Sequence, residues 1–209
     1  MTFHTISQSF AMEDKMKYII PIIILSFVLL SCSKEEETQT AAEKAAAAQL
    51  VALEGTWKTA CYTNSDNTSF IDTITFAGNS ITGHFEKHSD TSCATDYSLE
   101  GFNWTFSIGD AVTFSNGTGH KFSITIGSTY KLTPQSASAV SAFNSKPECS
   151  KSDWELNTEK ECSNEDAGDT VYCLYQLDGN TWYSKCDSSS YPSTSDIQTD
   201  NASSTFVKQ

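Results

Sequence analysis

Arginine is absent from this chain of 209 residues, and all 13 of its basic residues are lysines. Arginine is the usual residue for two-pronged capture of carboxylate and phosphate groups, so a site of that kind is not expected. The 26 acidic residues give a formal net charge of −13, and such a surface repels the phosphate backbone of nucleic acids. We therefore expect no nucleic-acid partner.

Several catalytic patterns are also missing. The sequence has no G-x-S-x-G turn that would present a catalytic serine, and residues 115–119 lack the spacing of a phosphate-binding loop. No two cysteines have the C-x₂-C spacing of common zinc sites. We expect no enzyme activity and no cofactor. A metal-dependent enzyme is the remaining alternative, because His84, Glu86 and His88 alternate along one expected strand and would share a face. The simpler interpretation of these three residues is a solvated outer face.

Only one long apolar run is present, from Tyr18 to Leu30, and it is shorter than the roughly 20 residues that span a bilayer. Lys15 and Lys17 precede the run, and Ser31 and Cys32 follow it. This arrangement is typical of a signal peptide. The end of the run resembles the lipobox of bacterial lipoproteins. The resemblance implies that residues 1–31 are a signal peptide and that Cys32 is lipidated with acyl chains such as palmitate. Residues 1–11 do not belong to the signal-peptide pattern, and Met12 or Met16 is the more natural start.

The residues after Cys32 bear on the final location of the protein. Ser33 stands where an aspartate would favour retention in the inner membrane, so we expect a lipid-anchored protein of the bacterial envelope, in the outer membrane rather than the inner. The acidic stretch 34–37 resembles tags that direct some lipoproteins to the cell surface. A solvated tether is the plainer interpretation of this charge run.

Six cysteines remain in the chain after Cys32. An even number of cysteines in an exported chain predicts disulfides, and six cysteines allow 15 connectivities. Pairing between neighbours in the sequence is the simplest of these. It gives Cys61–Cys93, Cys149–Cys162 and Cys173–Cys186.

The hydrophobic pattern changes at Gly55. Residues 32–54 form a tether followed by a short helix over 41–54, which is rich in strong helix formers. Residues 55–209 show short segments with period-2 alternation, separated by turns such as 77–80 and 178–180, with no alternation of strands and helices. We predict an all-β fold, an antiparallel up-and-down barrel of about eight to nine strands. A parity change in the segment 97–108 predicts a bulge or bend at Gly101, 109–110 reads as a turn, and 134–170 reads as irregular.

The motif Gly55-Thr56-Trp57, placed after a short helix, resembles the G-x-W of lipocalins. The order of Cys61, the segment 89–93, the segment 132–134 and the terminal segment 206–209 is similar to that of bacterial lipocalin-like (calycin-type) exported proteins. The resemblance covers about residues 50–209. It implies a barrel that binds a small apolar molecule. Lipocalins usually cover the first-strand tryptophan with an arginine from the last strand, and here Lys208 is the only nearby substitute.

The expected ligand-binding residues are aromatic, since such side chains suit a flat apolar ligand; they are Trp57, Trp104, Phe106, Phe122 and Trp182. Plain core packing explains the same residues, because side chains alone can fill a small barrel. The alternative function is therefore a cell-surface or periplasmic protein-interaction module, such as an adhesin or an inhibitor. Recognition by an envelope protein partner would then rest on the loops 134–170 and 187–204.

Overall fold

The computed structural model describes residues 40–115, 117–192, 197 and 202–209. The expected signal peptide, Cys32 and the tether up to residue 39 lie outside the described residues, as does part of the loop 187–204. Among the residues that are described, no helix combines the length and the apolar character needed to cross a bilayer.

The chain enters the barrel through the helix α1, Ala41–Leu53, close to the expected bounds. Thr40 caps its start, because the Thr40 hydroxyl accepts from the Glu43 N–H while the Glu43 carboxylate accepts from the Thr40 N–H. Side chains at 41, 43–45, 47 and 48 are exposed, whereas Leu53 is buried in the core. Only the last part of α1 packs on the barrel.

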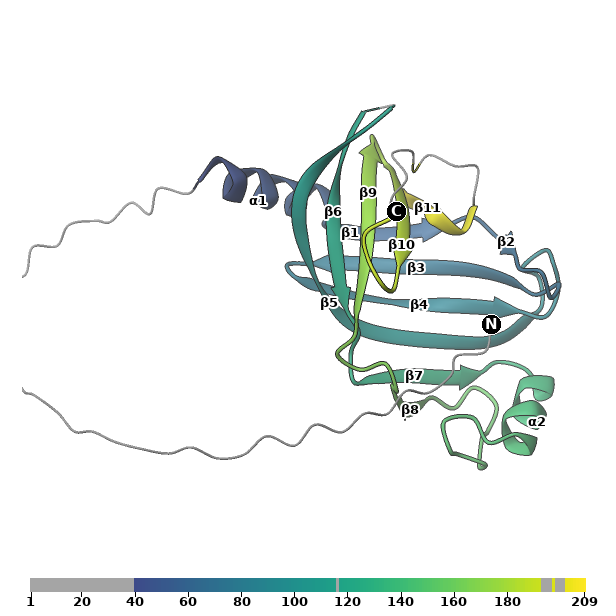
Figure 1. Cartoon of the computed structure of the whole chain (residues 1–209). Coiled ribbons are helices and arrows are strands. Elements are labelled where there is room, and N and C mark those ends of the chain that lie inside the picture. The colour runs from purple at the N-terminus through teal and green to yellow at the C-terminus, as the bar shows by residue number, and fades with distance from the viewer. Residues whose placement is uncertain (1–39, 116, 193–196, 198–201) are drawn as a thin grey trace, which may run out of the picture. The chain divides into compact units, whose positions relative to one another are not determined.

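Eight antiparallel strands form the closed barrel, which confirms the predicted fold (Figure 1). In order around the barrel they are β1 (Gly55–Thr59), β3 (Ser69–Ala77), β4 (Ser80–His88), β5 (Asp96–Phe114), β6 (Gly117–Thr125), β9 (Thr170–Asp178), β10 (Thr181–Asp187) and β11 (Thr205–Lys208). Each pairs with the next, and β11 pairs with β1 to close the ring. The ring therefore has up-and-down topology. Two of its hairpins use the predicted two-residue Gly-Asn turns, at 78–79 and 179–180.

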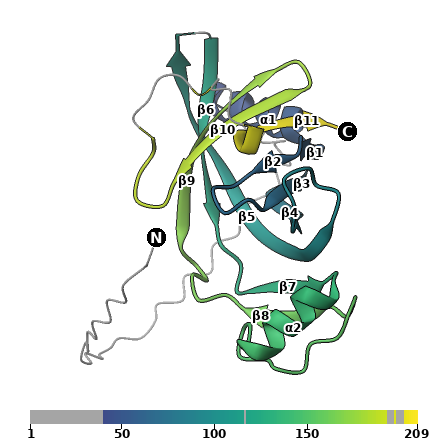
Figure 2. The ribbon, with the colours of Figure 1, turned by 90° about the vertical axis from the view of Figure 1, so that its right-hand side faces the viewer.

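The other elements lie outside the ring. The short strand β2 (Tyr62–Thr63) pairs with β3, and a 3₁₀ turn spans Ala202–Ser204. Between β6 and β9 the chain forms β7 (Thr129–Pro134), the helix α2 (Ala137–Ser145) and β8 (Lys160–Ser163). We call residues 126–169 the insertion, because β6 and β9 pair directly and a short turn would connect them. It lies beside β5, since β7 pairs with the first half of β5 and β8 pairs with β7 (Figures 1 and 2).

The expectation that 134–170 is irregular is therefore wrong. The helix α2 begins after Ser136, whose hydroxyl accepts from the Ala139 N–H. Its buried side chains are Ala139 and Phe143, four residues apart. They pack with Leu132, Trp154 and Cys162 into a separate small core. The segment thus has a hydrophobic core of its own.

The bulge expected at Gly101 is absent, because Gly101 pairs in register with His84 on β4 and with Lys131 on β7. The register shifts instead between Lys87 and His88, where Tyr97 is the extra residue on β5. This shift lies before Leu99, so it does not explain the apolar parity change between Leu99 and Phe102. Leu99 lies on the outer side of the sheet, between Glu86 on β4 and Thr133 on β7, whereas Phe102 faces the core. A second shift lies between Ile108 and Ala111, so 109–110 interrupts the register within β5 and does not end the strand.

The three disulfides join the expected pairs, Cys61–Cys93, Cys149–Cys162 and Cys173–Cys186. The first ties the end of β1 to the β4–β5 connection, the second lies within the insertion, and the third joins opposite residues of β9 and β10. Two of the disulfides therefore lie in the barrel and one lies in the insertion.

Candidate functional site

The barrel interior holds four of the five aromatic residues expected to bind a ligand. Trp57, Phe106, Phe122 and Trp182 are at most 6% exposed. Their rings contact one another and that of Phe76: Phe76 lies 5.0 Å from Phe106 and 5.2 Å from Trp182, and Trp182 lies 6.1 Å from Phe122 and 6.3 Å from Trp57. Edge-to-face contacts at these distances are favourable and leave little space between rings. The described interior is packed with side chains.

Trp57 is held at the α1 end of this aromatic cluster. Its Nε1 donates a 2.7 Å hydrogen bond to the Leu53 carbonyl at the end of α1. The ammonium of Lys208, on the last strand, lies 5.2 Å above the centre of the Trp57 ring, at a distance where a cation attracts an aromatic face. Lys208, the nearby substitute expected from the sequence, thus lies over the tryptophan of the first strand.

Trp104, the fifth expected residue, is only partly buried at the edge of the barrel core. Its ring stacks 4.2 Å from Phe102 and lies 6.4 Å from Phe85. Its Nε1 is buried and has no hydrogen-bond partner in the described part of the chain. None of the five aromatic residues lines either of the two cavities described next.

A cavity of about 360 Å³ lies between α1 and the barrel. Its lining comes from α1, β6, β9 and the β9–β10 turn: Gln49, Ala52, Thr118, Gly119, His120, Tyr175, Leu177 and Gly179. The Tyr175 hydroxyl donates to the Gln49 amide oxygen at 3.3 Å, and His120 stacks 5.8 Å from the Tyr175 ring. Burial raises the pKa of Tyr175 well above its usual value, so Tyr175 stays a neutral hydrogen-bonding group.

A larger groove of about 490 Å³ crosses β3, β4, β5, β7 and β8 on the outer face of the sheet. The barrel and the insertion both line it, with Thr73, Thr75, Thr82, Gly83, His84, Gly101, Phe102, Asn103, Thr129, Tyr130, Lys131 and Glu161. Thr73 and Thr75 alternate with the buried Ile74 and Phe76, so they face outward. We call this site the outer groove. It exists only because the insertion extends the sheet beyond β5.

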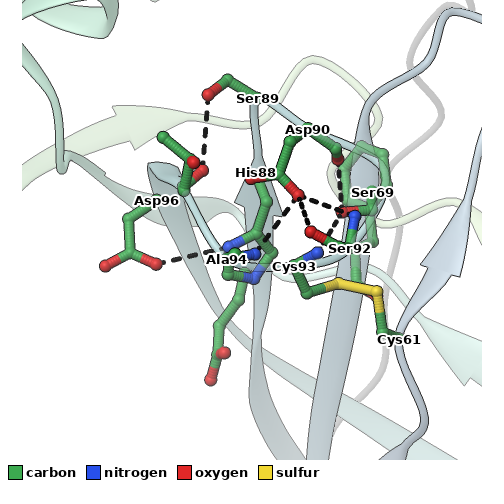
Figure 3. A network of polar contacts seen from close by, with 12 residues as sticks. Cys61, Ser69, His88, Ser89, Asp90, Ser92, Cys93, Ala94 and Asp96 are labelled. Carbon is green, nitrogen blue, oxygen red and sulfur yellow. Dashed lines mark hydrogen bonds and ion pairs between the residues drawn. A yellow bond between two sulfur atoms is a disulfide. The ribbon is translucent and has the colours of Figure 1, made fainter.

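The possible metal-binding residues do not gather at one point. His84 Nε2 lies 3.0 Å from Glu86 Oε1, and the ammonium of Lys58 lies 3.6 Å from the same oxygen, where it would repel a metal cation. His88 shares their side of β4 but is 4% exposed, with its Nδ1 3.3 Å from Asp96 Oδ1 (Figure 3). In the described chain no group of three metal-ligating side chains comes together. The arrangement is that of separate ion pairs.

The segment 89–95 covers His88 and is itself fixed from several sides (Figure 3). The Ser69 hydroxyl donates to the Asp90 carbonyl at 2.6 Å and accepts from the Cys93 N–H at 3.0 Å. Hydrogen bonds from Thr95 and Ser92 hold the pKa of the Asp90 carboxyl well below its usual range. With the disulfide of Cys93 to Cys61, these contacts tie the segment to β3 and to the end of β1.

The outer groove was not expected from the sequence. Its signal is the row of outward-facing threonines on β3 and β4, together with a glycine in the middle of β5. Threonine is common on the exposed faces of strands, so the row does not distinguish a site from a solvated surface. Comparison of the sequence with known family models and with curated proteins found no match in either case. Of the sites described above, the outer groove has the largest volume and joins the barrel to the insertion.

Proposed function

We propose that this chain is a lipid-anchored protein of the bacterial envelope that recognises a partner molecule through the outer face of a rigid barrel. The observation that carries the proposal is the filled interior. The aromatic cluster around Trp182 occupies the space in which a carrier of this shape would hold its ligand. A packed barrel is a rigid support for recognition at its surface.

The insertion is the second support. A turn of a few residues would join β6 to β9, yet residues 126–169 build a separate core with its own disulfide. Within it the amide of Asn144 holds the Trp154 backbone, donating to the carbonyl at 2.9 Å and accepting from the N–H at 2.7 Å. The barrel closes without this segment, because β6 and β9 pair directly. A role in recognition would explain why the segment is present.

The anchor and the location rest on the sequence. The apolar run before Cys32 supports export and lipidation. An exported chain also fits three disulfides, which persist in oxidising compartments. The net charge of −13 and the lack of arginine argue against a nucleic-acid partner.

The test replaces residues 127–168 by Asn-Gly in the full chain. Ile126 and Asp169 already form a backbone hydrogen bond of 3.0 Å, so a two-residue turn is compatible with the β6–β9 hairpin. We expect an intact barrel, checked by near-ultraviolet circular dichroism and by two remaining disulfides, and loss of partners that the unchanged chain captures from envelope extracts. Capture of the same partners by a folded, shortened chain would count against the proposal.

A second candidate function is binding of a small apolar ligand, and the cavity beneath α1 favours it. The ligand would lie at the barrel mouth above Tyr175, not among the aromatic residues of the core. Native mass spectrometry of the chain purified from the envelope would detect a retained small molecule. Its loss in a Leu177→Trp variant, which fills the cavity, would support this function over recognition at the outer face.

A further inference from the structure

We infer that the outer groove is a binding site for a neutral, hydroxyl-rich ligand, namely a saccharide. The inference rests on the proposed function, because it names the class of partner that the outer face would recognise. It is carried by three properties of the outer groove: a glycine that the fold does not require, the chemistry of the lining, and its position over strands that are mostly paired on both sides.

Gly101 lies at the centre of the outer groove, between His84 on β4 and Lys131 on β7. A glycine inside a strand weakens it, and usually marks a bulge, a sharp bend or the close approach of another group. The register at Gly101 is continuous, and its backbone lies outside the left-handed region. A Cβ built there would meet nothing closer than the Lys131 Cβ at 3.7 Å, which is an ordinary contact. Of the usual reasons for a glycine inside a strand, the close approach of another group is the one left, and we take this group to be a ligand.

Gly83, the other glycine of the outer groove, differs in this respect. A Cβ at Gly83 would lie 2.1 Å from the Thr73 carbonyl oxygen and 2.9 Å from the Phe102 ring, so packing alone explains it. Packing therefore requires a glycine at position 83 and does not require one at position 101. A residue there would fill the outer groove between His84 and Lys131.

The lining offers neutral hydrogen-bonding groups in close succession. Four threonines and the amide of Asn103 line the outer groove. The Oγ1 of Thr73 is buried and has no hydrogen-bond partner in the described part of the chain. Because solvent does not reach this hydroxyl, the exposed polar groups of the lining, Thr82 and Asn103, are the ones that can bond a ligand directly. The volume of about 490 Å³ lies within the range of small-ligand sites, about 300–1,000 Å³.

Other ligand classes fit less well. The only ammonium in the lining, that of Lys131, already pairs with Glu159 at 2.7 Å, and the Glu161 carboxylate lies in the same lining, so an anion is disfavoured. An extended peptide gains affinity by pairing with a free strand edge. Most of the outer groove lies over β3, β4, β5 and β7, which are paired on both sides, and only Glu161 comes from β8, the terminal strand of the sheet. A saccharide binds through its hydroxyls and needs no strand edge.

The test compares three forms of the full purified chain on a printed array of neutral and acidic oligosaccharides. They are the unchanged chain, Gly101→Val, which fills the outer groove, and Ser107→Val as a control. Ser107 is an exposed residue further along the same strand and outside the groove lining. We expect the unchanged chain and the control to bind the same neutral saccharides, and Gly101→Val to bind at least tenfold more weakly.

Folding is monitored separately from binding. Because valine suits a strand and a Cβ at position 101 makes only ordinary contacts, the melting temperature of Gly101→Val should equal or exceed that of the unchanged chain. If that variant fails to fold, Asn103→Ala removes an exposed lining amide and must weaken binding by itself. Unchanged binding in a folded Gly101→Val or in Asn103→Ala overturns the inference.

Failure of the inference is distinguishable from failure of the proposed function. If the unchanged chain binds no saccharide on the array, the inference is overturned. The proposed function is then judged by capture from envelope extracts treated with protease or with periodate. Loss of capture after protease, with capture unchanged after periodate, leaves recognition of a protein partner standing.

Discussion

The hydroxyl of Tyr62 donates a 2.8 Å hydrogen bond to Oδ2 of Asp72, whose side chain lies on the core side of β3. Asp72 is 6% exposed, and its Oδ1 has no hydrogen-bond partner in the described part of the chain. Burial raises the pKa of Asp72 to about 6, while the hydrogen bond from Tyr62 acts in the opposite direction. A buried carboxyl that titrates near neutral pH makes the stability of the barrel depend on pH.

The sign of this dependence follows from linkage. The pKa of Asp72 is higher in the folded state than in the unfolded chain, so the folded state binds the proton more tightly. The contribution is fully present below about pH 4 and is lost as the pH rises through about 6. Its size is on the order of 2 kcal/mol. Unfolding in denaturant at a series of pH values measures it.

Asp72→Asn is the matched control for this titration. The amide is similar in size, still accepts from Tyr62 and carries no charge, so the variant should lose this part of the pH dependence. It should also be more stable than the unchanged chain at pH 7. Carboxyls such as Asp90, whose pKa is lowered, are present in both forms and cancel in the difference. A difference that does not change between pH 4 and 7 would contradict the assignment.

The two glycines of the outer groove should respond in opposite ways to alanine. Gly83→Ala places a Cβ 2.1 Å from the backbone oxygen of Thr73, so β3 and β4 must move apart. The free energy of unfolding should fall by about 1–3 kcal/mol or more. In Gly101→Ala the Cβ makes only ordinary contacts, the nearest at 3.7 Å from the Lys131 Cβ, so this variant should be neutral or stabilise the fold by about 0.5–1 kcal/mol. Chemical denaturation of both variants measures the change in the free energy of unfolding. Equal decreases would show that packing requires a glycine at position 101 as well.

Two disulfides should stabilise different parts of the chain. Replacing Cys149 and Cys162 by alanine should lower the free energy of unfolding of the insertion by about 3 kcal/mol, because the unfolded loop is no longer constrained. Amide exchange should then quicken in α2 and β8 and stay slow in β9 and β10. Replacing Cys61 and Cys93 should lower the stability of the barrel itself by about 3–4 kcal/mol. The same exchange pattern in both variants would show that the insertion is not a separate unit.

Lys208→Met keeps the length and apolar stem of the side chain and removes its charge from the face of Trp57. The lost cation–π contact should lower the free energy of unfolding by about 0.5–2 kcal/mol. Lys208→Arg is the control, because a guanidinium stacks on an aromatic face at least as well. Denaturation midpoints of the three proteins measure the effect, and equal midpoints would mean that the charge contributes nothing.

Cys32→Ala tests the predicted lipid anchor. The unchanged chain should sediment with membranes and incorporate labelled palmitate, because more than one acyl chain makes membrane attachment stable. The variant should lose the label. Labelled palmitate in Cys32→Ala would place the modification elsewhere.

The barrel could be predicted because its signals are local. Period-2 alternation of segments such as 71–76, and Gly-Asn turns such as 179–180, depend on neighbouring residues alone. The disulfides followed from sequence proximity. The helix α2 was missed because its residues are small and polar, with only Ala139 and Phe143 marking a buried side. The position of the β5 bulge was missed because register depends on the partner strand, which local pattern does not reveal.

The candidate site could not be predicted because it depends on which strands meet. Thr82, Asn103 and Thr129 are far apart in the sequence and resemble ordinary exposed strand residues. They line one groove only because β7 pairs with the first half of β5. The expected aromatic residues were correctly placed in strands. Whether they line a cavity or fill it depends on ring-to-ring distances, which the sequence does not contain.

Photo-crosslinking in living cells decides between recognition at the outer face and carriage of a ligand at the barrel mouth. A diazirine side chain is placed either at Thr82 or at Gln49. Thr82 lies in the outer groove and Gln49 lines the cavity at the barrel mouth. Recognition at the outer face predicts a crosslinked product from position 82 and none from position 49. A product from position 49 alone would contradict the account and assign the barrel to carrying a ligand.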